Sequence, residues 1–275
     1  MFPLHPILAT NAFWFAIQNA TGEGKATIGA LLLLSLFSWT IIISKIRQLH
    51  IARKWAKKFF EAYNASRDPL EVKRKGEEYE GAPAYQLYIR GADELDYQLK
   101  NNPVIVKNQQ RISPASYEAI KVVLEEAAAA EAMALEKGMI VLSTAVAGGP
   151  FIGLLGTVWG VMSTFSGIAE AHSASLTAMA PGVAAALIAT VVGLLVAIPA
   201  MFGYNFMVTT IRMITQELDG FASRFANQIE HNYVDNRPLS EEIRSANEML
   251  AMRITDALRG NSAETRELAG YADDK

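Results

Sequence analysis

The stretch GMIVLSTAVAGGPFIGLLGTVWGVM, residues 138–162, decides the fold together with AMAPGVAAALIATVVGLLVAIPAMFGYNFM, residues 178–207. Each is longer than the ~20 apolar residues that an α-helix needs to cross the hydrocarbon core of a bilayer. Across residues 138–207 the only acidic, basic or histidine residues are Glu170 and His172. Both stretches are therefore expected to be transmembrane helices, joined by a short loop at residues 163–177.

The composition agrees with a membrane protein that also has polar parts. The chain has 275 residues, of which 51% are hydrophobic and 19% are charged, and the charged residues are concentrated outside the apolar stretches. The net charge of −3 gives no electrostatic reason to expect nucleic-acid binding. The chain has no cysteine, which excludes a disulfide framework and thiolate chemistry.

A third apolar stretch, residues 26–46, predicts another transmembrane helix, and the positive charges around it predict its orientation. The basic residues at its end and directly after it are Lys45, Arg47, Arg53, Lys54, Lys57 and Lys58. The segment before it contains a single basic residue, Lys25, and residues 163–177 contain none. Because cytoplasmic loops carry the excess of lysine and arginine, we expect the N-terminus outside the cell membrane and the C-terminus inside.

The polar segments are expected to be mostly helical. Residues 47–137 would form a cytoplasmic loop with turns at Pro69, Gly81, Pro83 and Ser113-Pro114. A helix from Tyr117 is expected to continue into the second span without a break, because its residues are strong helix formers. The apolar residues Ile211, Ile214, Leu218, Phe221, Phe225 and Ile229 recur at helical spacing. They predict a cytoplasmic helical extension over residues 208–235, followed by a polar tail over residues 236–275.

The N-terminal segment, residues 1–25, is aromatic and apolar but too short to span a membrane. It fits either an interfacial helix lying on the periplasmic side of the membrane or a loosely ordered terminus.

Small residues recur along the second and third spans and mark faces on which helices can approach closely. In the second span they are Gly149, Gly153, Gly156 and Gly160. In the third span they form two adjacent stripes, one of Gly182, Ala186 and Thr190 and one of Ala185, Ala189, Gly193 and Ala197. One stripe is expected to pack within the chain and the other against a neighbour or a central helix, which favours an oligomer over a monomeric bundle. Pro150, Pro181 and Pro199 each remove a backbone donor and are expected to break or loosen these helices.

Thr157 and Thr190 stand on these small-residue faces. A threonine in a membrane helix often bonds only the carbonyl one turn back, and this is our expectation for Thr144. For Thr157 and Thr190 this local bonding and a role in lining an ion pathway both stay open. No aspartate or glutamate lies within the three spans, so a proton relay would need a carboxylate from another chain.

Several of these runs resemble the ExbB/TolQ/MotA family of proton-channel motor subunits. PFIGLLGTVWGVM, residues 150–162, is similar to the second-helix signature of ExbB and TolQ, and APGVAAALIATVVGLLVAIPAMFGYN, residues 180–205, is similar to the third-helix signature. LEKG at residues 135–138 and SWTIIISK at residues 38–45 also fit the family. Three spans with a large first loop resemble ExbB or TolQ more than MotA, which has four. The strong match covers about residues 135–207.

The resemblance implies an all-α protein of the bacterial inner membrane, assembled as a homo-pentameric ring around two helices of an ExbD/TolR-like partner. Each partner helix carries an aspartate, and proton passage onto and off that aspartate would drive rotation. The torque would act on a TonB- or TolA-like protein that spans the periplasm. Thr157 and Thr190 would line the pore and face the aspartate. H⁺ is the expected ion, Na⁺ is an alternative, and no cofactor or metal is expected.

One position departs from the family pattern. The family reads PGIAEAL in the third helix, whereas this chain reads PGVAAAL, so that Ala185 stands where the family has a glutamate. Either the partner's aspartate suffices for proton transfer, or this chain conducts in another way. The departure keeps open a second class of function, a membrane scaffold for an envelope complex that carries no ion flux.

An enzymatic function is not expected from the sequence. The histidines His5, His50, His172 and His231 are scattered without metal-ligand spacing, and neither HExxH nor GxSxG occurs. The basic cluster at residues 53–58 is explained by membrane topology and anionic lipid at least as well as by nucleic acid.

Overall fold

The computed structural model describes residues 21–106, 109–171 and 176–235, together with Trp14, Gln18, Arg237, Ser240, residues 243–244 and residues 247–255. Most of the N-terminal segment 1–25, the centre of the loop 163–177 and much of the tail 236–275 therefore lie outside the described residues. The predictions made for these segments are not tested by the structure.

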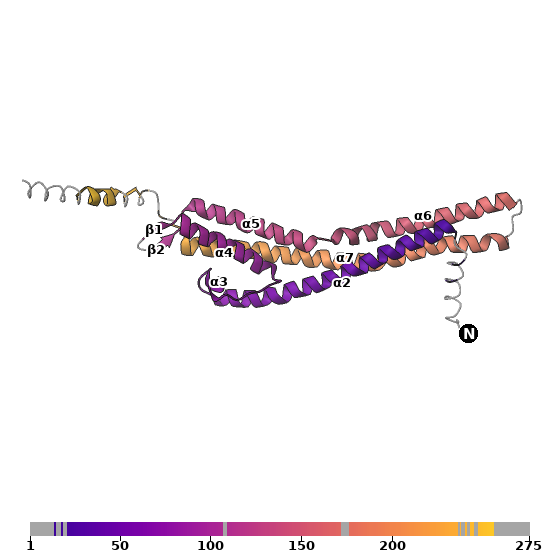
Figure 1. Cartoon of the computed structure of the whole chain (residues 1–275), viewed down its shortest axis with the longest axis horizontal. Coiled ribbons are helices and arrows are strands. Elements are labelled where there is room, and N and C mark those ends of the chain that lie inside the picture. Colours follow the sequence, from indigo (N-terminus) through magenta and orange to yellow (C-terminus); the bar gives the residue numbers. More distant parts are fainter. Residues whose placement is uncertain are drawn as a thin grey trace, which may run out of the picture. The chain divides into compact units, whose positions relative to one another are not determined.

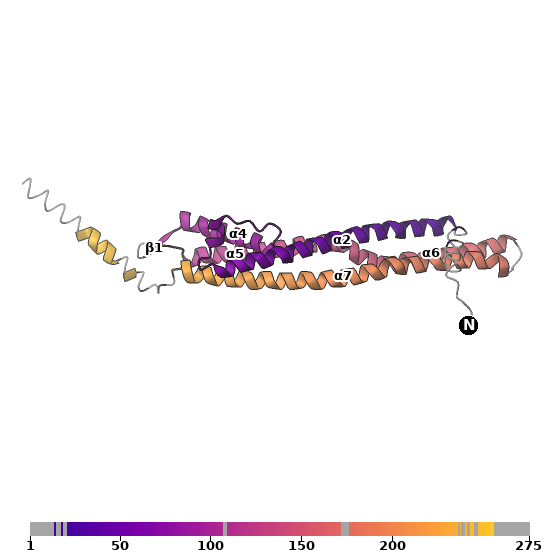
Figure 2. The ribbon, with the colours of Figure 1, turned by 90° about the horizontal axis from the view of Figure 1, so that it is seen from below.

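The described residues form six named helices and two short strands, which are labelled in Figures 1 and 2. In chain order they are α2 (Gly22–Ala65), α3 (Glu71–Lys75), α4 (Pro83–Asn101), β1 (Val104–Val106), β2 (Gln109–Arg111), α5 (Pro114–Glu136), α6 (Met139–Ala171) and α7 (Leu176–Tyr233). Three of them, α2, α6 and α7, are long and apolar enough to cross a membrane. The three expected spans are thus confirmed, and the chain is a multi-pass membrane protein.

The contacts divide the chain into two compact units. The first unit consists of Met1–Leu95 and Ile120–Gln228, and the second consists of Asp96–Ala119 and Ile229–Lys275. The first unit contains the three apolar helices, which run side by side in both views (Figures 1 and 2). It therefore holds every residue of the candidate site.

Helix α2 joins the first span to the basic segment that follows it. It begins after Thr21, whose side chain accepts a hydrogen bond of 3.2 Å from the backbone N–H of Gly24, and it continues past the predicted end of the span at residue 46 to Ala65. A hydroxyl that accepts from the free N–H groups of the first turn is a common helix start. The first span and the start of the polar segment are consequently one helix of 44 residues.

The prediction of a single helix running from Tyr117 through the second span is wrong. Helix α5 ends at Glu136 and α6 begins at Met139, with Gly138 between them at φ 88°. Glycine adopts a positive φ without the steric cost that a side chain imposes, so it ends the helix here. The polar helix and the apolar helix are therefore separate elements that meet at a glycine turn.

Helices α6 and α7 are longer than the predicted spans and continue through their prolines. Helix α6 runs to Ala171, beyond the expected end at residue 162, and α7 is continuous over 58 residues. The prolines Pro150, Pro181 and Pro199 all lie inside these helices, so they do not break them. A proline removes one backbone hydrogen bond, and in a packed membrane helix neighbouring groups can compensate for the loss.

The core of the first unit is built along α7. Near the middle of the apolar region, Leu31 of α2 packs with Val192 and Val196 of α7. The predicted apolar face of the helical extension is confirmed, because five of its members are buried in this unit, namely Ile211, Ile214, Leu218, Phe221 and Phe225, and Ile229 is buried in the second unit. Phe59 of α2 meets the Phe221 ring edge-on with ring centroids 5.4 Å apart, within a larger aromatic cluster. Such contacts stabilise packing beyond the burial of apolar area alone.

The second unit contains a small antiparallel hairpin that an all-α prediction missed. Strands β1 and β2 pair with Val104 opposite Arg111 and Val106 opposite Gln109. After β2, the N–H of Ile112 donates to the carbonyl of Tyr233 at 2.8 Å, and the N–H of Asp235 donates to the carbonyl of Ile112 at 3.0 Å. The fold is therefore mostly helical, and the second unit also contains a short β-hairpin whose following residue, Ile112, is hydrogen-bonded to the end of α7.

Candidate ion pathway at the contact of α6 and α7

Helices α6 and α7 approach so closely that side chains are excluded at several points of their contact. A Cβ atom on Gly153 would lie 2.8 Å from the carbonyl oxygen of Ala189, and one on Gly193 would lie 2.6 Å from the carbonyl oxygen of Gly149. Real Cβ atoms essentially never come that close to a backbone atom. The glycines are thus required by the distance between the two backbones, as is typical of helix pairs in membranes.

Residues of both small-residue stripes of α7 face α6 within one chain. From the first stripe, Gly182 approaches Thr164 and Ala186 approaches Gly160. From the second stripe, the residues that contact glycines of α6 are Ala189, Gly193 and Ala197, whose partners are Gly149, Gly153 and Gly156. The prediction that one stripe stays free for a neighbour or a central helix is therefore not supported by this packing. A case for an oligomer has to rest on other surfaces.

Large apolar side chains cover those other surfaces. Leu36 on α2, Phe151 on α6 and Phe202 on α7 are 64%, 71% and 68% exposed. Apolar faces of this extent occur in proteins that bury them against lipid or against another chain. The helix faces turned away from the α6–α7 contact are thus available to the bilayer and to neighbouring subunits.

Thr157 and Thr190 contact one another across this contact. The Thr157 hydroxyl lies 3.2 Å from the carbonyl oxygen of Gly153 in its own helix and 3.2 Å from that of Ala186 in α7. The Thr190 hydroxyl lies 3.3 Å from the same Gly153 oxygen, and the two hydroxyls also form a hydrogen bond with each other. The Thr157 hydroxyl therefore has the local acceptor expected for an ordinary membrane threonine, the Gly153 carbonyl. It also has two further hydrogen-bond partners in α7, the Ala186 carbonyl and the Thr190 hydroxyl.

Because several acceptors lie within reach, the two hydroxyls can exchange hydrogen-bond partners. A hydroxyl has a single proton to donate and two lone pairs that can accept. Thr157 can direct its proton to Gly153, to Ala186 or to Thr190, and both hydroxyls are half-buried rather than sealed in the core. The pair can consequently turn a donor or an acceptor toward a polar group that reaches it from outside the chain.

Other threonines of α6 differ in this respect. The Thr144 hydroxyl donates to the carbonyl of Ile140 at 2.8 Å, so that its predicted local bonding is confirmed. The Thr164 hydroxyl donates to the carbonyl of Gly160 at 2.8 Å. Both of these hydroxyls bond within α6, whereas the hydroxyls of Thr157 and Thr190 pair across the two helices.

One hydroxyl near the pair was missed from the sequence. Thr27, in the second turn of α2, is buried and lies 2.7 Å from the position that a Cβ on Gly156 would occupy. Its hydroxyl donates to the carbonyl of Gly24 at 2.8 Å. No periodicity links Thr27 to the small-residue stripes, and only the packing of α2 on α6 reveals it.

The site has no acid of its own. Ala185 is 6% exposed and packs against Ile188, where the family pattern would have a glutamate. Within the described residues, no group of three or more His, Cys, Asp and Glu side chains could hold a metal ion. The chemistry available at Thr157 and Thr190 is therefore hydrogen bonding by hydroxyls and backbone carbonyls.

Comparison with known proteins agrees with this architecture. Residues 98–220 match the model of the MotA/TolQ/ExbB proton channel family. The Tol-Pal system protein TolQ of Haemophilus influenzae strain Rd is 30% identical over 226 residues, covering 78% of this chain and 92% of the relative. TolQ of Pseudomonas aeruginosa PAO1 is 29% identical, covering 78% of this chain and 90% of the relative. The biopolymer transport protein ExbB of Pseudomonas putida is 33% identical, covering 72% and 57%.

The similarity therefore extends well beyond residues 135–207, to which the sequence motifs assigned it. The family model includes α5, the second and third spans, and the polar part of α7 as far as residue 220. The chain belongs to the MotA/TolQ/ExbB proton channel family.

Proposed function

We propose that this chain is an ion-channel subunit of a motor driven by the proton-motive force, and that it energises transport or envelope processes in the bacterial inner membrane. The observation that carries the proposal is the hydroxyl pair of Thr157 and Thr190 at a contact between membrane helices with no acid of its own. Such a pair can serve a carboxylate that a partner brings. The partner is a single-span protein of the ExbD/TolR type with an aspartate in its membrane helix.

In this proposal the threonines lower the cost of ionising the partner's aspartate inside the membrane. An unpaired carboxylate in an apolar medium is strongly destabilised. When the aspartate is ionised, the Thr157 hydroxyl turns away from Gly153 or Ala186 and donates to it. When the aspartate is protonated, its own O–H donates to a threonine oxygen and the threonine proton returns to a backbone carbonyl. Both protonation states then have a partner, which lets the proton come and go.

The proposed assembly is a homo-pentamer around two partner helices, with a TonB- or TolA-like protein receiving the torque. The exposed apolar faces of α2, α6 and α7 supply surfaces for neighbouring subunits and for lipid. The proposed orientation places the N-terminus in the periplasm, and the polar helices and the C-terminus in the cytoplasm, because basic residues follow the first span. H⁺ is the proposed ion and Na⁺ the alternative, and no cofactor is part of the mechanism.

A membrane scaffold without ion flux is the second candidate function, and Ala185 favours it. A buried alanine in place of the family glutamate removes the one acid that this chain could have placed in its own spans. The two functions differ in a measurable property, since a scaffold supports assembly of the envelope complex with no proton uptake.

Replacing the hydroxyls in the full chain, expressed with its partner, tests the proposal. Thr157→Val and Thr190→Val keep the shape and remove the hydroxyl. Each is expected to lower proton-driven output in cells by about tenfold or more, since a hydrogen bond to a charged group contributes about 1.5–3 kcal/mol. Thr144→Val is the matched control, because its hydroxyl bonds only its own helix. Wild-type output from both valine variants would exclude a role of the pair in ion passage.

A further inference from the structure

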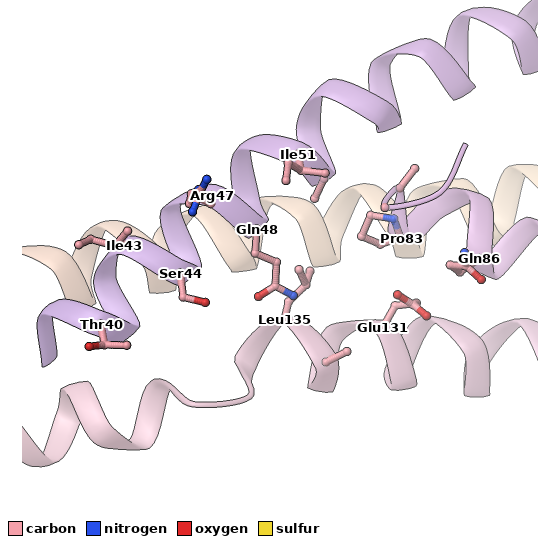
Figure 3. Close-up of a pocket in the computed structure, with 14 residues that line it drawn as sticks. Thr40, Ile43, Ser44, Arg47, Gln48, Ile51, Pro83, Gln86, Glu131 and Leu135 are labelled. Atoms are coloured by element: carbon pink, nitrogen blue, oxygen red, sulfur yellow. The ribbon is translucent and has the colours of Figure 1, made fainter. Parts of the chain in front are cut away.

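A cavity of about 750 Å³ lies in the first unit, where α2 passes the beginning of α4 and the end of α5. Figure 3 shows its lining residues, among which Thr40, Ile43 and Arg47 come from α2 and Glu131 and Leu135 from α5. Its volume is typical of a pocket that encloses a small molecule or part of a larger one. The cavity lies away from Thr157 and Thr190, and the proposed ion passage makes no use of it.

The lining of the cavity on α2 runs from Thr40 to Ala52, and its polarity changes along the helix. Thr40 and Ile43 belong to the apolar stretch 26–46, whereas Arg47 and Gln48 belong to the basic segment that follows. The cavity therefore crosses the level at which the helix leaves the hydrocarbon. A ligand that fits such a site has an apolar part and a polar part, arranged along the direction of the helix.

The polar part of the lining contains a free positive charge, on the Arg47 side chain. Arg47 is exposed, and it forms no hydrogen bond or ion pair with any other described residue. Lys45, two residues before it, is buried and already engaged, since its Nζ donates to the Gln48 side chain and to the carbonyl of Leu135. The guanidinium of Arg47 is thus the cation that remains for a ligand, and its planar fork suits a phosphate.

Glu131 is the acid among the residues that line the cavity. Burial raises the pKa of Glu131, and the nearby Arg90 counteracts part of that rise. A protonated Glu131 would donate a hydrogen bond to a phosphate oxygen instead of repelling it. Gln86, which also lines the cavity, has an uncharged amide that can donate as well.

We infer that this cavity holds the headgroup and the adjoining part of one acyl chain of an anionic phospholipid from the cytoplasmic leaflet. Arg47 takes the phosphate, and the apolar residues toward Thr40 contact the chain. The inference relies on the membrane orientation given under the proposed function, and it does not rely on proton passage. A lipid in this position would sit between α2 and α5 and fasten the polar helices to the membrane surface.

Lipid retention by the purified full-length assembly tests the inference. The protein is reconstituted in bilayers of equal parts phosphatidylglycerol and phosphatidylcholine, then re-extracted, and its retained lipids are identified by native mass spectrometry. We expect phosphatidylglycerol to be enriched about fivefold over phosphatidylcholine, the factor that one basic residue near a membrane contributes. Arg47→Gln should abolish this enrichment, and Arg47→Lys should restore part of it.

The matched control is Arg53→Gln, which removes an exposed positive charge from the same helix but outside the cavity. It should keep the enrichment. Equal losses from Arg47→Gln and Arg53→Gln would mean a diffuse attraction of lipid to basic residues, and full enrichment in Arg47→Gln would mean that the cavity holds no anionic lipid. Either result overturns the inference.

A second pair of variants changes the space and leaves the charge alone. Ala134 lines the cavity, so Ala134→Phe should exclude the lipid, whereas Met133→Phe, at an exposed neighbouring position outside the lining, should not. The alternative occupant is a second copy of this chain. Since the chain has no cysteine, Ala134→Cys gives an unambiguous cross-linking report, and a cross-link between copies at this position would contradict a lipid occupant.

A failure of the lipid inference can be distinguished from a failure of the proposed ion-channel function. Thr157→Val should retain phosphatidylglycerol as the wild type does, even where proton-driven output is lost. Arg47→Gln is expected to lose the lipid with the hydroxyl pair intact.

Discussion

Lys45 of α2 and Leu135 of α5 are joined by a hydrogen bond of 2.8 Å, from the lysine Nζ to the backbone carbonyl oxygen. Leu135 lies in the last turn of α5, where carbonyl groups have no partner within the helix. A buried lysine therefore caps the end of one helix from the side of another, directly before the turn at Gly138. Lys45 thus turns inward and links α2 to the junction of α5 and α6.

Removing this amine should loosen the junction. Lys45→Met keeps most of the side-chain volume but leaves the Leu135 carbonyl without its donor. We expect the free energy of unfolding to fall by about 1–3 kcal/mol, the cost of an unsatisfied buried polar group. Thermal unfolding of the purified protein measures it, with Lys54→Met, at an exposed position of the same helix, as the control. Equal stability of the two variants would show that the bond contributes nothing.

The closeness of α6 and α7 predicts a contrast between two glycines of one helix. Gly153→Ala would place a methyl group 2.8 Å from the Ala189 carbonyl oxygen and 3.0 Å from the Thr190 Cα, so the two backbones would have to separate. Overpacking of this kind costs about 1–3 kcal/mol. Gly148→Ala meets no atom within 4 Å and should be neutral or slightly stabilising. Unfolding temperatures of both variants give the comparison, and a tolerated Gly153→Ala would mean that the helices are farther apart than described.

The parts of the fold that were predicted correctly depend on composition and periodicity. Three apolar stretches of sufficient length led to three membrane helices, and the recurrence of apolar residues from Ile211 to Ile229 predicted a face that is buried. Both are properties of one helix at a time, so they can be recognised without knowing what the helix packs against.

The misses have a different origin. The break at Gly138 had a local signal, a lysine followed by glycine, which is typical of a helix end, but the strong helix formers before it led to the opposite prediction. The hairpin of β1 and β2 has only three residues in each strand, too few for an alternating pattern to stand out. The position of Thr27 over Gly156 depends on how α2 packs on α6, which no pattern within α2 contains.

The candidate site was predictable in part for the same reason. Small residues at helical spacing identified the faces of α6 and α7 that carry Thr157 and Thr190. Which faces meet was not predictable from spacing, and for that reason one stripe was assigned to a neighbouring chain although residues of both contact α6. The hydrogen bond between the two hydroxyls required the relative placement of the two helices.

Restoring the family glutamate separates the two candidate functions. Ala185 is buried, so Ala185→Glu introduces an acid at a crowded position and should lower the unfolding temperature of the assembly. If the partner's aspartate suffices, as we propose, proton uptake into vesicles containing the complex should be present in the wild type and should not rise in the variant. Uptake that is absent in the wild type and appears in Ala185→Glu would identify the natural chain as a scaffold. Ala185→Gln, equal in size and uncharged, is the control for steric effects.

The raised pKa of Glu131 predicts how stability depends on pH. Burial favours the protonated carboxyl in the folded state, with Arg90 opposing, so the folded protein binds this proton more tightly than the unfolded chain does. Stability from this group is fully present below the usual glutamate pKa of 4.5 and is lost as the pH rises through the higher pKa of the folded state. At neutral pH the ionised side chain is therefore a net cost.

Glu131→Gln removes that cost. In neutral detergent without anionic lipid, we expect the variant to be more stable than the wild type at pH 7, and the difference to shrink as the pH falls toward 4.5. Denaturant unfolding of both proteins across this range measures the difference, with Glu126→Gln, an exposed position of the same helix, as the control for helix propensity. A variant less stable than the wild type at neutral pH would show that ionised Glu131 is held by a favourable ion pair, and that Arg90 outweighs burial.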